Sequence, residues 1–173
     1  QAFSAMRECV HPVIAQVHGH AIGSGLEMAI GCDIVIAAAG TTLGLIETRV
    51  GAIPGGGATQ LLPRLVGIAR AKELIFTGRR FPVEEALGWG LVSAVVPADE
   101  LDATVRALAE EICLSAPIAV TQAKKALNKS LDLDLASGLE LEAALYERTL
   151  TTRDRAEALV AYRERRPPVF EGC

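Results

Sequence analysis

The chain has 173 residues, half of them hydrophobic and 22% charged, which is enough apolar material for one compact core and excludes a disordered chain or a large multidomain enzyme. Its 17 basic and 21 acidic side chains give a net charge of −4, so the composition does not favour nucleic acid or an anionic membrane surface as a partner. Glycine or a charged residue interrupts every apolar stretch, and we expect no membrane-spanning segment.

Cysteine and histidine give no sign of a metal site. The four cysteines are scattered and form no C-x-x-C pair, so we expect free thiols in a reducing compartment. His18 and His20 are the only close histidine pair and lack ligands at a suitable spacing, so no metal is expected. Residues 1–11 do not resemble a signal peptide, which predicts a cytoplasmic protein, or one of the mitochondrial matrix if a transit peptide precedes this segment.

The composition changes partway along the chain. Residues 1–98 are rich in glycine and β-branched side chains, whereas residues 99–173 hold few glycines and follow helical spacing. In the first part, 12–17 and 33–38 are short apolar runs that each end close to a glycine, as is typical of buried parallel strands. Helix-forming residues 25–30 follow a glycine turn between them. This order of strand, turn, helix and strand predicts an α/β fold.

Further along, the pattern becomes mainly helical. Residues 59–65 and 69–76 are predicted helices, with Pro63 dividing them or opening a new turn, and 91–96 is predicted to be a last strand. Apolar stripes at helical spacing follow, and a charged amphipathic segment closes the chain. The stripes are Val105, Leu108, Ala109 and Ile112; Val120, Ala123 and Leu127; and Leu139, Ala143, Tyr146 and Leu150; the closing segment is Arg153–Arg166. So many stripes on a small core indicate that one of them packs on another subunit.

Common nucleotide-binding and nucleophile motifs are absent. Residues 51–57 have the glycines of a phosphate-binding loop, but Ala58 stands where that loop needs lysine. Residues 23–25 read Gly-Ser-Gly without the flanking glycines of a nucleophile elbow, and no dinucleotide fingerprint is present. Two glycine turns remain, each with a glutamate nearby.

Those glutamates are candidates for acid/base chemistry. Glu27 lies in the first turn of a predicted helix, where backbone N–H groups are free to bind a developing negative charge, although an acid there is also simply favoured by the helix dipole. Glu47 precedes the glycines at 55–57, and a glutamate in this place, taken alone, is more often an exposed carboxylate at a strand end. Together the carboxylates and amide-rich turns provide an acid, a base and an oxyanion site, as proton transfer beside a carbonyl requires.

Four segments in order resemble the enoyl-CoA hydratase/isomerase (crotonase) family. They are HGHAIGSGLEMAIGCD (18–33), LGLIET (43–48), IPGGGATQ (53–60) and ALGWGLV (86–92). The resemblance implies a crotonase-like spiral of ββα turns, here its C-terminal part over residues 1–98, and a helical trimerisation region over 99–173, with trimers or dimers of trimers as assemblies. Residues 71–78 and 152–168 look most like the methylglutaconyl-CoA hydratase branch and its near relatives.

The resemblance also implies roles for individual residues. Glu27 and Glu47 match the two glutamates that activate water and transfer a proton to the α-carbon, and the backbone N–H of Ser24 matches an oxyanion donor, at a position where the family usually has glycine. The remaining matches concern substrate and water. Gly23, Ile46 and Gly55 are expected to contact substrate or water, and Tyr162 and Arg165 are expected to approach the CoA. No separate cofactor is implied, because CoA is part of the acyl-CoA substrate.

The implied reaction is addition of water across the 2,3 double bond of a 2-enoyl-CoA. Double-bond isomerisation is an alternative, and the family's isomerases typically need only the glutamate matching Glu47, so Glu27 favours hydration. The resemblance begins partway into the family domain, so the chain is expected to lack the other oxyanion N–H. Its catalytic activity by itself is therefore expected to be impaired. A non-catalytic assembly partner is another alternative. RNA binding is disfavoured because no lysine-rich helix is present.

Overall fold

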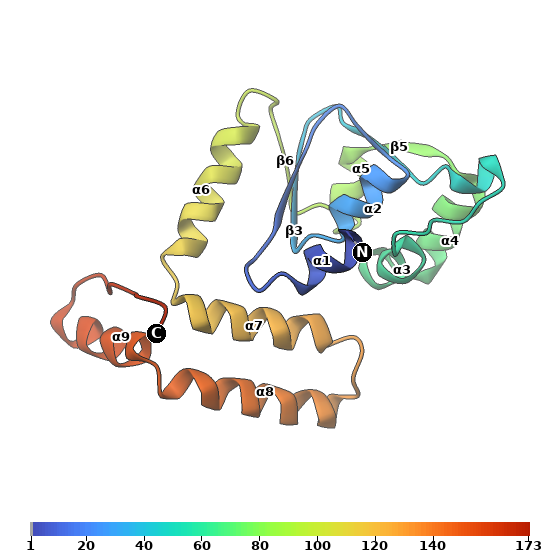
Figure 1. Cartoon of the computed structure of the whole chain (residues 1–173). Coiled ribbons are helices and arrows are strands. Elements are labelled where there is room, and N and C mark those ends of the chain that lie inside the picture. Colours follow the sequence, from blue (N-terminus) through green and yellow to red (C-terminus); the bar gives the residue numbers. More distant parts are fainter. Residues whose placement is uncertain (1) are drawn as a thin grey trace. The chain divides into compact units, whose positions relative to one another are not determined.

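The structure is a computed structural model that describes residues 2–173, and these form two compact units (Figure 1). The first unit holds the chain up to Cys9 together with Val13–Ala107, and the second holds Val10–Pro12 together with Leu108–Cys173. The chain passes from the first unit to the second inside helix α6 (Leu101–Cys113), whereas the composition changes near 97–99. Leu101, at the start of α6, is buried at 3% exposure, which explains why the first turns of this helix belong to the first unit.

The first unit alternates short strands with short helices. Its elements are α1 (Ala2–Glu8), β1 (Ile14–Val17), β2 (His20–Ile22), α2 (Ser24–Ile30), β3 (Ile34–Ala38), β4 (Thr42–Gly44), the 3₁₀ turn η1 (Glu47–Val50), α3 (Ala58–Val66), α4 (Ile68–Thr77), β5 (Arg80–Pro82), α5 (Val83–Gly88) and β6 (Ala94–Val96). The strands expected at 12–17 and 33–38 and the helix expected at 25–30 are confirmed as β1, β3 and α2.

The strands pair as a spiral of ββα turns requires. β1 pairs with β3, and β3 with β6, in parallel in one sheet, while β2 pairs in parallel with β4 in a second sheet that β5 joins antiparallel. Each ββ pair along the chain therefore contributes its first strand to one sheet and its second strand to the other. Buried side chains from both sheets and from α2 to α5 form one apolar core, with Leu26, Leu43, Leu62, Leu74 and Phe81 among its largest members.

Two boundaries differ from the predicted ones. Pro63 does not divide the two helices that follow the glycine cluster; it lies inside α3, and the break is at Gly67, whose φ of 80° and ψ of 154° end one helix and start the next. The last strand is shorter than 91–96 because the N–H of Leu91 donates to the carbonyl of Ala86 (2.9 Å) and closes α5. The backbone conformation of Gly67 decides the first boundary and a backbone hydrogen bond the second, and the side-chain pattern reports neither.

The second unit is helical, as predicted. It contains the end of α6, then α7 (Pro117–Lys129), α8 (Leu135–Leu150) and α9 (Arg153–Glu164). Pro117 stands in the first turn of α7, where its missing N–H costs nothing, and the carboxylate of Asp134 accepts the Ser137 N–H to cap α8. Helices α7 and α8 pack side by side, joined by a short turn (Figure 1).

The apolar stripe predicted on α8 is not the face that packs within the unit. Leu139, Tyr146 and Leu150 are 54%, 59% and 43% exposed, whereas Leu145, on the other face of α8, is buried. The apolar stripe predicted on α7 is also partly exposed to solvent, since Leu127 is 71% exposed. Within the part of the chain that the structure describes, no helix is both long and apolar enough to cross a membrane.

Candidate active site

The site is organised around Gly23, where β2 ends and α2 begins. Its N–H donates to the carbonyl of Gly44 (2.8 Å), which ties the end of β2 to the end of β4. Its carbonyl accepts the N–H of Glu27 (3.0 Å), and a Cβ added to Gly23 would lie 2.9 Å from Oε1 of Glu47. The backbone at Gly23, with φ 59° and ψ −125°, is one that other residues rarely adopt. One glycine therefore lies beside both predicted acid/base residues.

Glu27 is a buried carboxylate held by backbone N–H groups. It is 2% exposed, and its Oε1 accepts the N–H of Gly56 (2.7 Å) and the N–H of Ala58 (3.1 Å). Glu27 does lie in the first turn of α2, as an acid favoured by the helix dipole would, but its carboxylate is buried on N–H groups of another segment rather than exposed to solvent. Ala58 is the first residue of α3, so the carboxylate also accepts one of the N–H groups that a helix leaves unpaired at its start.

Glu47 is held differently. It is the first residue of η1 rather than an exposed carboxylate at a strand end, because β4 ends at Gly44. The residue is half-buried, and its Oε2 is buried without a hydrogen-bond partner among the described residues. A buried carboxylate oxygen without a partner is uncommon in a folded protein, so Glu47 is a candidate for contact with a ligand.

The other predicted residues of the first unit are neighbours of these groups along the chain. Ser24 is exposed at the first position of α2, where its N–H has no acceptor within the helix. Ile46 is half-buried and precedes η1, accepting the N–H of Arg49 through its carbonyl (3.0 Å). Gly55 is exposed and adjoins Gly56. Their roles toward substrate and water stay predictions.

Two residues of this site escaped the sequence analysis. Gly56, rather than its neighbour Gly55, donates to Glu27, and a Cβ on Gly56 would lie 2.8 Å from Glu27 Oε2 and 2.6 Å from the ring of Phe3. The run of three glycines at 55–57 signalled a close approach but not which glycine makes it. Phe3, on α1, carried no signal at all, because its contact with the site depends on packing between distant segments.

Tyr162 and Arg165 lie in the second unit. Tyr162, on α9, is 85% exposed, and Arg165 ends that helix with a φ of 56°, the only positive value at a residue other than glycine among residues 2–173. Both side chains are open to solvent. Their expected contact with CoA stays a prediction.

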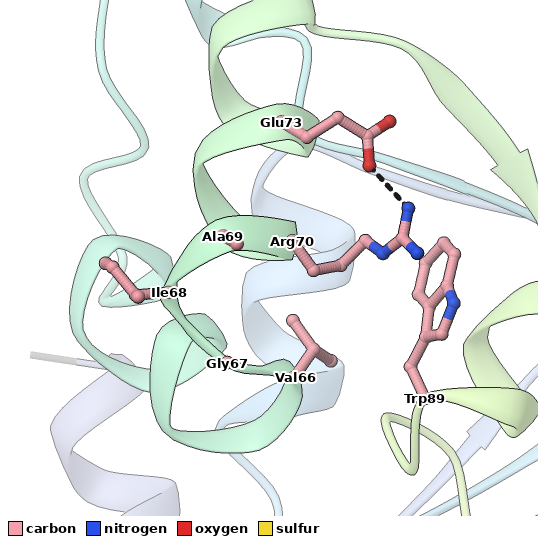
Figure 2. Close-up of a pocket in the computed structure, with 7 residues that line it drawn as sticks. All are labelled: Val66, Gly67, Ile68, Ala69, Arg70, Glu73 and Trp89. Carbon is pink, nitrogen blue, oxygen red and sulfur yellow. Dashed lines mark hydrogen bonds and ion pairs between the residues drawn. The ribbon is translucent and has the colours of Figure 1, made fainter.

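A concavity of about 630 Å³ lies elsewhere in the first unit, at the turn between α3 and α4 (Figure 2). Arg70 lies 4.6 Å from the ring centre of Trp89 and pairs with Glu73 (2.7 Å), as Figure 2 shows. Arg79 pairs with Glu73 (2.6 Å) and with Glu85 (3.0 Å). The hydrogen bond from Arg79 to Glu73, followed by that from Arg70, lowers the pKa of Glu73. These charges satisfy one another, so this network joins α4 to α5 rather than forming a second reactive site.

Across residues 2–173, no three His, Cys, Asp or Glu side chains come together as metal ligands. The groups that the site described above offers are two carboxylates and nearby backbone N–H groups. Such a set can move protons to and from a carbon beside a carbonyl while N–H donors stabilise the enolate oxygen. The fold and the site thus define an α/β protein of ββα turns with two candidate acid/base carboxylates.

Comparison with known proteins identifies the family. The enoyl-CoA hydratase/isomerase family model matches residues 1–173, and the chain belongs to this family. The crystal structure of enoyl-CoA hydratase from Bacillus anthracis superposes with a TM-score of 0.97 at 44% identity, over 99% of this chain and 66% of that one. The crotonase-type ββα fold predicted from the sequence is confirmed.

Curated relatives agree with this placement. Human enoyl-CoA hydratase domain-containing protein 2, mitochondrial, is 49% identical over 165 residues, which are 93% of this chain and 56% of that protein. Rat methylglutaconyl-CoA hydratase, mitochondrial, is 46% identical over 165 residues, 93% of this chain and 52% of that protein. The chain therefore spans about half the length of these two relatives.

Proposed function

We propose that the protein is an enoyl-CoA hydratase that adds water reversibly across the 2,3 double bond of a 2-enoyl-CoA thioester. The observation that carries this proposal is that Gly23 adjoins both glutamates, Glu27 through its backbone N–H and Glu47 through its side chain, while the Glu27 carboxylate is buried on two backbone N–H groups. A double-bond isomerase needs one carboxylate to move a proton, whereas hydration needs groups that act on both water and carbon. A second carboxylate fixed this firmly favours hydration.

In the proposed reaction, Glu27 accepts a proton from water as the water oxygen bonds to C3. The electron pair of the double bond moves toward the thioester carbonyl, and Glu47 delivers a proton to C2. Each acid/base role is expected to contribute about 10²–10⁴-fold to the rate. Return of the proton from Glu27 to Glu47 through solvent restores both side chains, so the net change is the addition of one water molecule, and no cofactor is proposed beyond the CoA that the substrate carries.

The backbone and the C-terminal helix have supporting roles in this proposal. The N–H of Ser24 stabilises the enolate oxygen, a contribution of about 10²–10³-fold for one donor. Gly23, Ile46 and Gly55 border the reacting carbon and the water, and Tyr162 and Arg165 contact the CoA. The assembly is a homo-oligomer, a trimer or a dimer of trimers, built through the helical region, and the compartment is the cytoplasm or the mitochondrial matrix.

The test is the loss of enoyl-thioester absorbance with a short 2-enoyl-CoA, measured for the 173-residue chain and for the full product of its gene. Glu27→Gln and Glu47→Gln keep the side-chain shape and remove the acid/base group, so each is expected to lower kcat by about 10²–10⁴-fold. Glu110→Gln, at an exposed position of α6, is the matched control and should leave the rate within about twofold.

The outcomes separate the alternatives. Hydration by the full product and its loss in both glutamine variants support the proposal. Conversion of a 3-enoyl-CoA to a 2-enoyl-CoA without formation of the hydroxyacyl product would instead identify an isomerase. If the full product leaves both substrates unchanged, the hydratase proposal is wrong, and an assembly partner without catalytic activity is the better description.

A further inference from the structure

The two candidate acid/base residues are anchored in different ways. The carboxylate of Glu27 is fixed directly, by N–H groups of Gly56 and Ala58. The carboxylate of Glu47 has no such support at Oε2, so its position depends on the backbone of η1. Whatever holds η1 in place therefore also sets the position of Glu47.

Thr48 makes the first of two links between η1 and helix α4. Its hydroxyl donates to the carbonyl of Ile75 (2.7 Å), which lies in the last turn of α4. The last carbonyls of a helix accept no N–H from within that helix. The Thr48 hydroxyl therefore supplies the hydrogen bond that water would otherwise give to the Ile75 carbonyl. The residue next to Glu47 is thereby bound to an element outside its own turn.

Arg49 makes the second link. Its Nε donates to the carbonyl of Thr77 (2.8 Å), the last residue of α4, where a positive charge also suits the helix dipole. The arginine stem lies across Gly78, since a Cβ at Gly78 would be 2.8 Å from Arg49 Cγ. Gly78 has a φ of 56° and ends α4, so one glycine both closes the helix and leaves room for this side chain.

Helix α4 is a rigid support for these two bonds. Ala71 and Leu74, on its inner face, are 2% and 0% exposed in the core of the first unit. Within η1 itself, the N–H of Ala52 donates to the carbonyl of Glu47 (3.0 Å), which closes the turn but connects it to nothing else. Among the residues that the structure describes, the two side-chain bonds to α4 are thus the polar connections that fix the turn to the core.

We propose that Thr48 and Arg49 are positioning residues that hold Glu47 at the reacting carbon by fastening η1 to the end of α4. The proposal rests on the proposed function for its catalytic consequence. A displacement of a proton donor by about 1 Å is enough to cost about 100-fold in rate, so loss of either bond should act on catalysis more than on substrate binding.

The experiment compares Thr48→Val, Thr48→Ser and Arg49→Met by backbone amide exchange and by steady-state kinetics with a short 2-enoyl-CoA, on the full product of the gene. Thr104→Val and Arg64→Met are matched controls, because each removes a side-chain bond to a backbone carbonyl, from Thr104 to Glu100 (2.9 Å) and from Arg64 to Gln60 (2.8 Å). Thermal unfolding establishes that every variant is folded.

We expect exchange at the Ala52 N–H to rise at least about tenfold, and kcat to fall about 10–100-fold with KM within about twofold, in Thr48→Val and Arg49→Met. Thr48→Ser, which keeps the hydroxyl, should restore both values, and the controls should change neither. Unchanged exchange at Ala52 overturns the anchoring. Raised exchange with an unchanged kcat overturns the catalytic consequence. Raised exchange in a protein that hydrates no enoyl-CoA supports the anchoring and refutes the proposed function.

Discussion

At the scale of single residues, Gly23 has the strictest requirements in the site. Its backbone conformation, φ 59° and ψ −125°, is open to glycine and rare for other residues, and a Cβ added there would meet Oε1 of Glu47 at 2.9 Å. Gly25, two residues later, lies in helix α2, and a Cβ added there would have nothing within 4 Å. The two glycines therefore form a matched pair for substitution.

Gly23→Ala is expected to lower the free energy of unfolding by about 1–3 kcal/mol, because backbone strain adds to the close approach of Glu47. Gly25→Ala should be neutral or should stabilise the protein by up to about 1 kcal/mol, since alanine is the better helix former. Urea denaturation of both variants measures the difference. Equal stabilities for the two variants would show that the contact between Gly23 and Glu47 does not constrain the site.

At the scale of elements, the last nine residues fold back onto α9 through two carboxylates. Asp154 is 2% exposed and accepts the N–H groups of Glu171 (2.8 Å) and Gly172 (3.0 Å). Glu157 accepts two bonds from the Arg166 guanidinium, at 2.6 and 3.0 Å, and the N–H of Val169 at 3.0 Å. The hydrogen bonds from Arg166, followed by that from Val169, lower the pKa of Glu157 from 4.5 to about 2.

This shift predicts a pH dependence for the closing segment. A carboxylate whose pKa is lower in the folded protein stabilises it fully above the unfolded value of 4.5, and this contribution is lost as the pH falls toward about 2. Glu157→Gln should therefore unfold at a lower temperature than the wild type above about pH 5, with the difference disappearing near pH 2. Thermal unfolding between pH 2 and 7 measures it.

The matched control for this prediction is Glu142→Gln, at an exposed position of α8, which should follow the wild type over the whole pH range. A difference between wild type and Glu157→Gln that persists unchanged to pH 2 would mean that lost packing, rather than the charge of Glu157, causes the effect.

At the scale of the whole molecule, the helical unit exposes large apolar side chains to solvent. Leu139, Tyr146 and Leu150 lie along one face of α8, and Leu127 on α7 is 71% exposed. Large exposed apolar side chains at helical spacing are typical of a helix face that packs on another subunit. We therefore expect the exposed apolar face of α8 to form the subunit interface of the proposed assembly.

We expect Leu139→Glu to weaken self-association by at least about 30-fold, because burying a carboxylate at the centre of an apolar interface costs about 2 kcal/mol or more. Leu139→Met, which keeps the apolar area, is the control and should assemble like the wild type. Sedimentation velocity over a range of concentrations measures both. A wild type that stays monomeric at every concentration, or a glutamate variant that assembles normally, contradicts this prediction.

Much of the fold was predictable because its signals are local. The apolar runs at β1 and β3 and the helix at α2 follow from side-chain pattern alone, and the parallel pairing of β1 with β3 follows from the helix between them. The break between α3 and α4 was not predictable in the same way. Proline is the stronger breaker by type, yet the chain turns at Gly67, because the backbone conformation there is one that glycine alone adopts readily.

The candidate site was likewise predictable only in part. The sequence by itself determined which residue types are available, Glu27 and Glu47 beside glycine turns, and the family to which they belong. Only the tertiary structure decided that Gly56 rather than Gly55 holds Glu27, that Gly23 lies against Glu47, and that Thr48 and Arg49 fasten Glu47 to α4. The physical reason is that the sequence states the type of each residue directly. A hydrogen bond between segments about 30 residues apart depends instead on how the intervening strands and helices pack.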